Sequence, residues 1–285
     1  MKRAMMSKVT AEMVKELRER TGVGMSKCKE ALDQANGDME AAIDILRKSG
    51  MASAVKKEGR ETKEGIIGSA ESPNAVALVE VNAETDFVTQ NERFKQFVKD
   101  VSLEVATSKP ANLEAFLKHS MAGKMSVDEC RSELVQSLGE NIQVKRFVLF
   151  NKSADVSYGL YSHMGGKIAV IVELTGGNGN EALARDIAMH VAAEAPEFLS
   201  PEEIPAEVRA READIAKSQV QGKPEAMIEK IVEGKLKAFS DQVCLLGQKY
   251  IKDNSLSIAQ LLEKESKRLG KTIAIRSFVR WKIGG

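Results

Sequence analysis

Two segments have the glycines and small polar residues that could bind a phosphate group. Residues 177–182 (GNGNEA) fit a GxGxx[GA] pattern between a predicted strand and a predicted helix, as in dinucleotide-binding loops. That helix leads to Pro196 and Pro201, with no second parallel strand that could carry an acid to the ribose, so a plain turn is favoured. Residues 270–272 (GKT) resemble the end of a P-loop, but Glu265 stands where the first glycine is required. The sequence therefore predicts no nucleotide-binding loop.

Histidines and cysteines, which could bind metals or act as nucleophiles, are not grouped in the sequence. They are Cys28, His119, Cys130, His163, His190 and Cys244. Three cysteines without a CxxC pair predict free thiols rather than disulfides or a zinc site, and the histidines lack a metal-ligand spacing. His190 lies among apolar residues and is predicted to be a core or boundary residue. We therefore expect no catalytic residue, no bound metal, no cofactor and no small-molecule substrate.

Composition and charge favour a protein that acts by contact with another protein. The 285 residues include 42 Lys and Arg against 41 Asp and Glu, so the net charge is +1, and 5% of residues are aromatic. A nucleic acid or an anionic membrane would favour a surplus of positive charge, so neither partner is predicted. The basic residues near the start precede no apolar segment, so no secretory signal is predicted and we expect a cytoplasmic protein.

The elements that would position any functional residue begin with three predicted helices over 9–50. Thr10 is a predicted N-cap of the first helix, and the second helix is predicted over 26–35. Asp38 is predicted to cap the third helix, because its carboxylate can accept the free amides of the first turn. The basic stretch 53–65 that follows is predicted to be a linker.

The rest of the chain contains an internal repeat, from which we predict an α+β core of two related halves. Strands over 75–82 and 169–173 have similar sequences, and each precedes a helix. Each is itself preceded by another predicted strand, over 65–71 and 156–163. Each half is predicted to be a small antiparallel sheet covered by helices. Extra residues over 83–91 occur in the first half only, which makes this segment a candidate functional loop.

Two predicted helices around a turn at 221–224 indicate an antiparallel helical hairpin that projects from the core. Further predicted elements are a helix capped by Ser126, a strand over 142–150, a helix capped by Ser257 and a strand over 272–283. The predicted domains are a helical domain with its linker (1–58), two core sub-domains (59–146, and 147–205 completed by 247–285) and the hairpin (206–246).

Two segments of the chain resemble hallmark sequences of bacterial-type elongation factor Ts. They are residues 17–32 (LRERTGVGMSKCKEAL) and 80–90 (EVNAETDFVTQ), and the similarity extends over essentially the whole chain, including 138–142 and 187–193. The resemblance implies a guanine nucleotide exchange factor that binds elongation factor Tu with GDP, displaces magnesium and GDP, and allows GTP to rebind. It also implies a UBA-like N-terminal helical domain, a core of two sub-domains and a protruding helical hairpin.

The resemblance further implies which residues contact the partner. Arg18 and Met25 would belong to the contact made by the N-terminal domain, whereas Leu138 and His163 would lie among the contacts of the core. The residues expected to displace the partner's magnesium are Thr85, Asp86, Phe87 and Val88. The family often has a second methionine where this chain has Ser26.

Each of these residues also has a simpler structural interpretation. The alternatives are a core position for Met25, Phe87 and Leu138, a helix cap for Asp86, a solvated helix position for Arg18 and a local hydrogen bond for His163. For the whole chain, the alternative is a UBA-like protein-binding scaffold without exchange activity.

Overall fold

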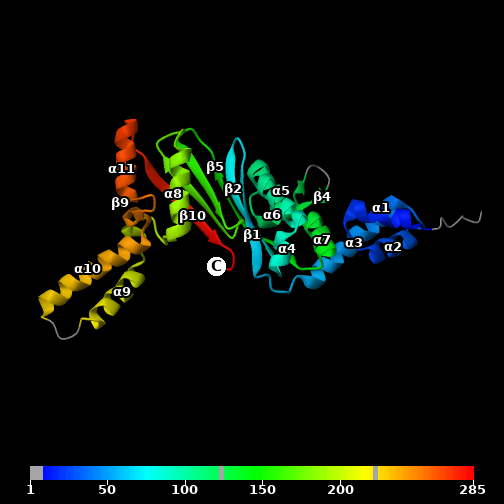
Figure 1. The fold of residues 1–285 in the computed structure, drawn as a ribbon, viewed down its shortest axis with the longest axis horizontal. Helices are drawn as coiled ribbons and strands as arrows, with labels where there is room; N and C mark the ends of the chain where they lie inside the picture. The colour runs from blue at the N-terminus through cyan, green and yellow to red at the C-terminus, as the bar shows by residue number, and fades with distance from the viewer. Residues whose placement is uncertain (1–8, 122–124, 221–223) are drawn as a thin grey trace, which may run out of the picture. The chain divides into compact units, whose positions relative to one another are not determined.

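Figure 1 presents a computed structural model of the chain, which describes residues 9–121, 125–220 and 224–285. The backbone divides into two units. Unit 1 consists of Met1–Asn151, Gly165–Lys167 and Lys282–Gly285, and unit 2 consists of Lys152–Met164 and Ile168–Trp281. Each unit contains helices and its own three-stranded sheet, so the α+β class predicted from the sequence is confirmed.

Three helices open unit 1. They are α1 (Ala11–Thr21), α2 (Met25–Gln34) and α3 (Met39–Lys57). The predicted caps are confirmed: the Thr10 hydroxyl accepts a hydrogen bond from the Met13 amide at 3.3 Å, and the Asp38 carboxylate accepts one from the Ala41 amide at 2.9 Å. The helices enclose a small apolar core, which contains Val14, Leu17, Val23, Cys28, Ala31, Leu32, Ala42 and Leu46.

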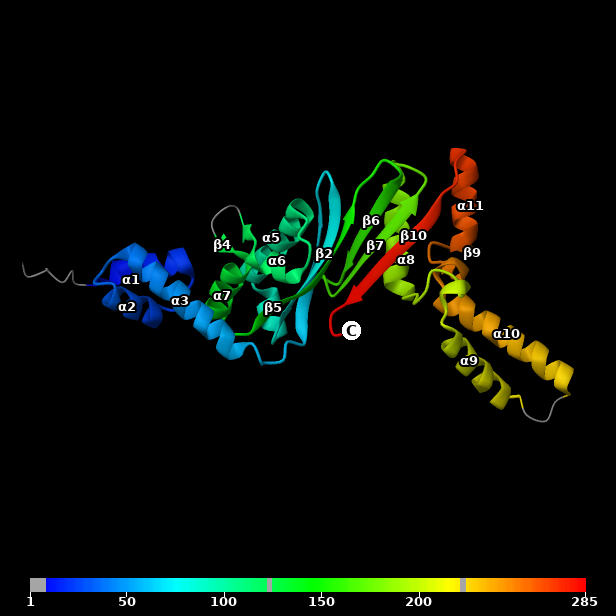
Figure 2. The ribbon, with the colours of Figure 1, turned by 180° about the vertical axis from the view of Figure 1, so that it is seen from behind.

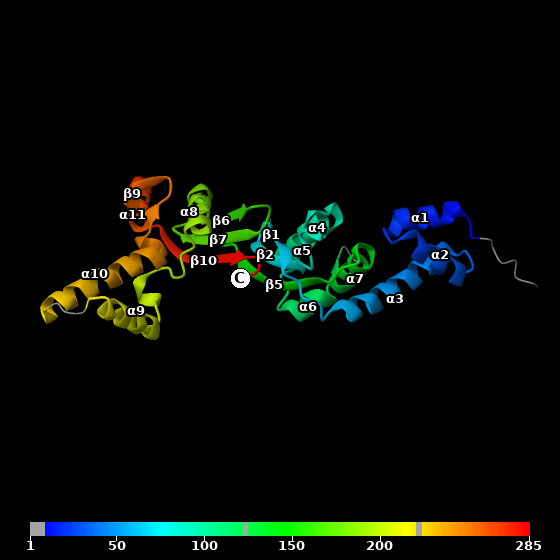
Figure 3. The same cartoon turned by 60° about the horizontal axis from the view of Figure 1, so that its bottom comes forward.

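Helix α3 extends further than the sequence predicts. The prediction of a linker over 53–65 is wrong for residues 53–57, because α3 continues to Lys57. Ala54 in this part is buried in the core formed with the first sheet, and basic side chains in the last helical turn suit the partial negative charge at a helix C-terminus. In the view of Figure 3, α3 runs beside α7 (Val127–Leu138), which follows in unit 1.

The sheet of unit 1 has the strand order β1-β2-β5, and the neighbouring strands are antiparallel. The strands are β1 (Glu64–Glu71), β2 (Ala75–Ala83) and β5 (Ile142–Asn151). The other elements are α4 (Asp86–Gln90), α5 (Glu92–Ser108), α6 (Leu113–Lys118), β3 (Ser120–Met121) and β4 (Met125–Ser126). Every residue of the central strand β2 is buried, and the apolar face of α5 packs on the sheet.

Unit 2 has a sheet of the same size with the strand order β10-β7-β6. The strands are β6 (Val156–His163), β7 (Ile168–Thr175) and β10 (Ala274–Lys282). Helix α8 (Glu181–Glu194) covers one face of this sheet and lies behind it in Figure 2. The remaining elements are η1 (Pro201–Glu203), α9 (Ala206–Ser218), α10 (Glu225–Val243), η2 (Leu245–Gly247), β8 (Lys249–Tyr250), β9 (Asp253–Ser257) and α11 (Ile258–Leu269).

A buried carboxylate occupies the central strand of each sheet. In unit 1, Glu80 of β2 accepts a hydrogen bond from the Arg146 guanidinium at 2.7 Å. In unit 2, Glu173 of β7 accepts bonds from Arg276 at 3.0 Å and from the Tyr158 hydroxyl at 3.1 Å. A carboxylate that is buried requires such partners. Both units have a carboxylate on the central strand that accepts a hydrogen bond from an arginine, in agreement with the sequence repeat.

Helices α9 and α10 pack against each other. Val232 of α10 and Ala216 of α9 are buried, together with Val220. The predicted turn between the helices involves residues 221–223, which lie outside the described residues. None of the described helices is both long and apolar enough to cross a lipid bilayer.

Candidate partner-binding surfaces

The extra segment of the first half forms the short helix α4 between β2 and α5. Phe87, in its first turn, is 84% exposed, whereas Val88 and Thr89 are buried. Val88 belongs to the core of unit 1. In unit 2 the corresponding connection, from Thr175 to Glu181, contains no helix. The segment therefore combines an anchored backbone with an aromatic side chain held in solvent.

The start of α4 is fixed by hydrogen bonds to the segment that follows α7. Glu140 accepts bonds from the Thr85 amide at 3.0 Å and from the Thr85 hydroxyl at 2.6 Å. In return, the Glu84 carboxylate accepts a bond from the Asn141 amide at 2.6 Å. Neither Glu84 nor Glu140 is predicted from the sequence to be a functional residue, although both lie within the segments that carry the family resemblance.

Two of the simpler interpretations for this segment are wrong. Phe87 is not a core aromatic, because 84% of it is exposed. Asp86 is not the helix cap, because Thr85 is the N-cap and Asp86 is the first helical residue. Asp86 is itself exposed, so its carboxylate and the Phe87 ring are both available to a partner.

The N-terminal helices expose the two residues assigned to them. Arg18 lies on the exposed face of α1, as its solvated interpretation also requires. Met25, the first residue of α2, is 49% exposed. The space between α1 and α2 is filled by other side chains, among them Leu17 and Cys28. The core interpretation of Met25 therefore does not fit.

Leu138 and His163 lie in different units. Leu138 ends α7, is half-buried and packs against the core of unit 1, two residues before Glu140. His163 ends β6 in unit 2 and is exposed, with Nδ1 3.2 Å from the Tyr161 hydroxyl and the two rings stacked at 6.0 Å. Both simpler interpretations, a core position and a local hydrogen bond, therefore describe real contacts of these residues. Because Leu138 precedes Glu140 by two residues, it lies near the Thr85–Glu140 contact within unit 1.

The glycine-containing turn before α8 is a plain turn, as predicted. The Glu181 carboxylate accepts a hydrogen bond from the Gly179 amide at 3.1 Å and one from the Ser157 hydroxyl at 3.3 Å. Bonds from backbone amides hold the pKa of Glu181 below its usual value, so a carboxylate of the chain already occupies this helix N-terminus. Gly270 caps the C-terminus of α11, with φ at +65°, so the second glycine segment also lacks the geometry of a phosphate-binding loop.

The histidines and cysteines form no candidate metal site. Among the residues that the structure describes, no three His, Cys, Asp or Glu side chains are placed to hold a metal ion. His190 is a buried core residue, as predicted, and its Nε2 lies 3.0 Å from the Gln248 Oε1. Burial lowers the pKa of His190 and raises the pKa of the Cys28 and Cys244 thiols, so both cysteines favour the neutral form.

Comparisons with known proteins agree on one family. The family model described as elongation factor TS matches residues 84–285. Elongation factor Ts of Protochlamydia amoebophila is 59% identical over 281 residues, which cover 98% of this chain and all of the relative. The proteins of that name from Chlamydia pneumoniae and Chlamydia muridarum are 47% and 44% identical, with the same coverage. The chain therefore belongs to the elongation factor Ts family of translation elongation factors.

Proposed function

We propose that the chain is a guanine nucleotide exchange factor for elongation factor Tu. It binds Tu with GDP, displaces magnesium and GDP, and allows GTP to rebind during translation elongation. The observation that carries the proposal is the exposure of Phe87 on a segment whose backbone is fixed by Glu140 and by the burial of Val88. An exposed aromatic on an anchored helix costs little conformational entropy to bind, which is typical of an interface anchor.

Exchange requires only that the contacts to magnesium and phosphate in the partner be shifted. Those contacts are few and charge-assisted, so displacing the elements that supply them speeds nucleotide release. The Phe87 ring is a rigid apolar wedge for a gap between partner helices, and the Asp86 carboxylate is an acceptor for donors there. Val88 and Thr85 fix this tip to the core. By reciprocity, nucleotide weakens the binding of the factor to Tu as much as the factor weakens nucleotide binding.

We propose further contacts and the domain division that the resemblance implies. Arg18 and Met25 contact Tu from a UBA-like domain, and Leu138 and His163 contact it from the core. The domains are the UBA-like domain with its linker (1–58), sub-domain N (59–146), sub-domain C (147–205, completed by 247–285) and a protruding helical hairpin (206–246). Support comes from the exposure of Arg18, Met25 and His163 and from the packing of α9 on α10.

The proposal describes a non-catalytic factor with a protein partner. It involves no cofactor of the chain, no small-molecule substrate, no direct nucleic-acid contact and no membrane, and it places the activity in the cytoplasm. The chemistry of GTP hydrolysis belongs to the GTPase partner, whereas the factor changes only binding equilibria and rates.

Release of a fluorescent GDP analogue from Tu tests the proposal. Substoichiometric amounts of the chain should speed release, because each molecule is displaced when GTP rebinds and then acts again. Binding to Tu without faster release would favour the scaffold alternative and contradict exchange activity. No binding to Tu would contradict both the partner and the activity.

A further inference from the structure

The side chain of Arg93 connects α5 to the end of α1. Arg93 is the second residue of α5, and its Nη2 donates a hydrogen bond to the Thr21 carbonyl oxygen at 3.1 Å. Gly22 follows with φ at +69°, and a Cβ atom there would lie 1.7 Å from the Arg93 Nη1 and 2.5 Å from its Cζ. The guanidinium therefore lies directly on the Gly22 backbone, in space that is open because glycine has no side chain.

The end of α1 is chemically suited to a guanidinium. Thr21 is the last residue of α1, and Gly22 is its left-handed C-cap. The last carbonyl groups of a helix lack intrahelical donors and carry the negative end of the helix dipole. A cation that donates a hydrogen bond to the Thr21 oxygen satisfies both requirements. A methionine at position 93 would satisfy neither, since it has no charge and no donor.

In the chain's contacts, Arg93 lies between Phe87 and Met25, the two exposed apolar residues proposed to contact the partner. On one side, the Arg93 amide donates to the Asn91 side chain at 2.9 Å, and Asn91 is both the C-cap of α4 and the N-cap of α5. Helix α4 carries Phe87. On the other side, Gly22 lies three residues before Met25. One side chain thus links the turn beside Phe87 to the loop that leads to Met25.

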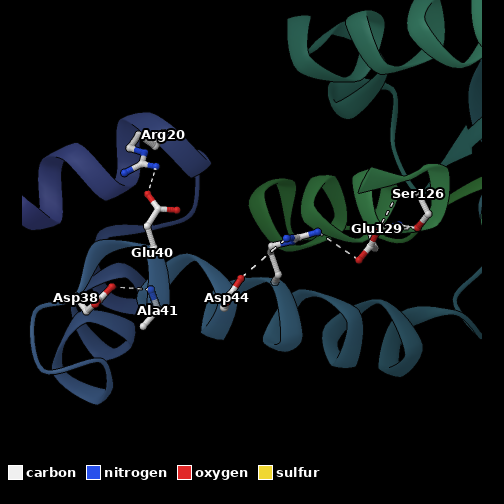
Figure 4. Close-up of polar contacts among 8 residues, drawn as sticks. Arg20, Asp38, Glu40, Ala41, Asp44, Ser126 and Glu129 are labelled. Atoms are coloured by element: carbon white, nitrogen blue, oxygen red, sulfur yellow. Dashed lines mark hydrogen bonds and ion pairs between the residues drawn. The ribbon is translucent and has the colours of Figure 1, made fainter. Parts of the chain in front are cut away.

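A second set of contacts holds α3 beside α7. Arg47 of α3 pairs with Glu129 of α7 at 3.3 Å and with Asp44 at 4.0 Å, as the dashed lines to Glu129 and Asp44 in Figure 4 indicate. A Cβ atom on Gly50 would lie 2.9 Å from the Gln136 Oε1, so the two helices approach closely there. Helix α3 is thereby held against α7 at Arg47 and Gly50, whereas Arg93 contacts the end of α1.

We propose that Arg93 is a positioning residue that holds the loop from Thr21 to Met25 at a set distance from α4. The proposal rests on the proposed function, because it assigns Met25 and Phe87 to one partner surface. Two contacts on a pre-arranged surface bind with less loss of conformational freedom than two contacts that move independently. Arg93 therefore acts through the placement of Met25 and not by touching the nucleotide.

The first test uses the free full-length chain and requires no partner. Arg93→Met removes the donor and the charge but keeps an unbranched side chain. The matched control is Arg20→Met, since Arg20 is an α1 residue whose ion pair, with Glu40 of α3 at 2.6 Å (Figure 4), lies within the three N-terminal helices. Backbone residual dipolar couplings report the orientation and motion of each segment. Arg93→Met should reduce the couplings over 21–25 relative to those of α5, and Arg20→Met should not.

The second test measures binding to nucleotide-free Tu. Arg93→Met should weaken binding roughly three- to tenfold, the range expected for one exposed intramolecular hydrogen bond. Met25→Ala should weaken binding in the wild-type background but by a smaller factor in the Arg93→Met background, because the Met25 contact is then already impaired. Gly22→Ala places a methyl group where the guanidinium lies, so it should reproduce the loss, and combining it with Arg93→Met should add little.

The outcomes separate the inference from the proposed function. Unchanged couplings in Arg93→Met, or equal effects of Met25→Ala in both backgrounds, would overturn the positioning role while leaving the partner surface intact. A different result would be reduced couplings in Arg93→Met but wild-type binding to Tu by both Met25→Ala and Phe87→Ala. It would overturn the partner surface, and the positioning role with it. Reduced couplings and a smaller Met25 effect would support the inference.

Discussion

The carboxylate of Glu140 accepts two hydrogen bonds from Thr85, one from the backbone amide at 3.0 Å and one from the hydroxyl at 2.6 Å. This contact joins residues 55 positions apart in the sequence. It fixes the backbone directly before Asp86 and Phe87, so the orientation of the exposed aromatic ring depends on a residue outside its own segment.

Glu140→Ala should therefore slow GDP release from Tu without changing Phe87 itself. The change removes an acceptor of two hydrogen bonds, which are together worth about 1–3 kcal/mol, and α4 should become mobile. The measurement is GDP release combined with hydrogen exchange of the α4 amides. Glu140→Gln is the control, because its amide oxygen keeps one acceptor. Equal exchange protection of α4 in wild type and Glu140→Ala would contradict this role.

Removal of the N-terminal residues should destabilise the core only when the second half of α3 is lost. Ala54 is buried in the core of unit 1, and Gly50 lies against α7. A chain lacking 1–44 keeps these contacts, whereas one lacking 1–57 exposes the surface beneath them. Both should stay folded by circular dichroism, but the second should melt several degrees lower, as expected for a loss of about 1–3 kcal/mol. Equal melting temperatures would mean that α3 contributes nothing to the core.

The buried imidazole of His190 should make the protein less stable below neutral pH. Burial lowers the pKa of His190 from its ordinary value of 6.5, and Nδ1 has no hydrogen-bond partner among the described residues. Well above pH 6.5 the ring is neutral in the folded and the unfolded chain. Below it the unfolded chain binds a proton that the folded chain resists, so the free energy of unfolding falls as the pH falls.

Urea unfolding at about pH 7.5 and about pH 5.5 measures this effect. The wild type should lose more stability between the two values than His190→Gln does. His163→Gln is the matched control, because it makes the same substitution at an exposed position. An identical pH dependence in wild type and His190→Gln would refute the assignment.

The chain alone should bind no guanine nucleotide. The two glycine-containing segments are a turn closed by Glu181 and a helix C-terminus at Gly270. Acceptors of the chain already bind the amides of Gly177, Gly179, Asn180, Gly270 and Lys271, which a phosphate would need. Isothermal calorimetry of GDP into the isolated chain should give no signal at micromolar concentrations. Saturable binding in that range would indicate a nucleotide site on the chain and contradict an effect exerted only through Tu.

Local signals made much of the fold predictable. The side chains of Thr10, Asp38, Ser126 and Ser257 cap helices as predicted, because a cap depends on residues only three positions apart. The sequence repeat predicted the central strands, since buried strands read as continuous apolar runs. The resemblance of residues 80–90 to the elongation factor Ts family predicted that Phe87 contacts the partner.

Contacts between distant residues could not be predicted in this way. The length of α3 depends on the burial of Ala54 against the first sheet, and its basic end resembled a linker in the sequence. Phe87 is apolar and follows a buried strand, so its exposure had no local signal. The pairing of Arg93 with Thr21 joins positions 72 apart and requires the folded chain.

The most direct measurement compares GDP release and thermal melting for Phe87→Ala and Leu103→Ala. Leu103, which is 50% exposed on α5, is a matched apolar control outside the proposed surface. Both variants should melt close to the wild type, because exposed side chains contribute within about 0.5 kcal/mol. Phe87→Ala should slow GDP release by about tenfold, more than it weakens binding to nucleotide-free Tu, with Asp86→Ala weaker in the same direction. Wild-type GDP release by a folded Phe87→Ala chain would contradict the proposal that this residue drives exchange.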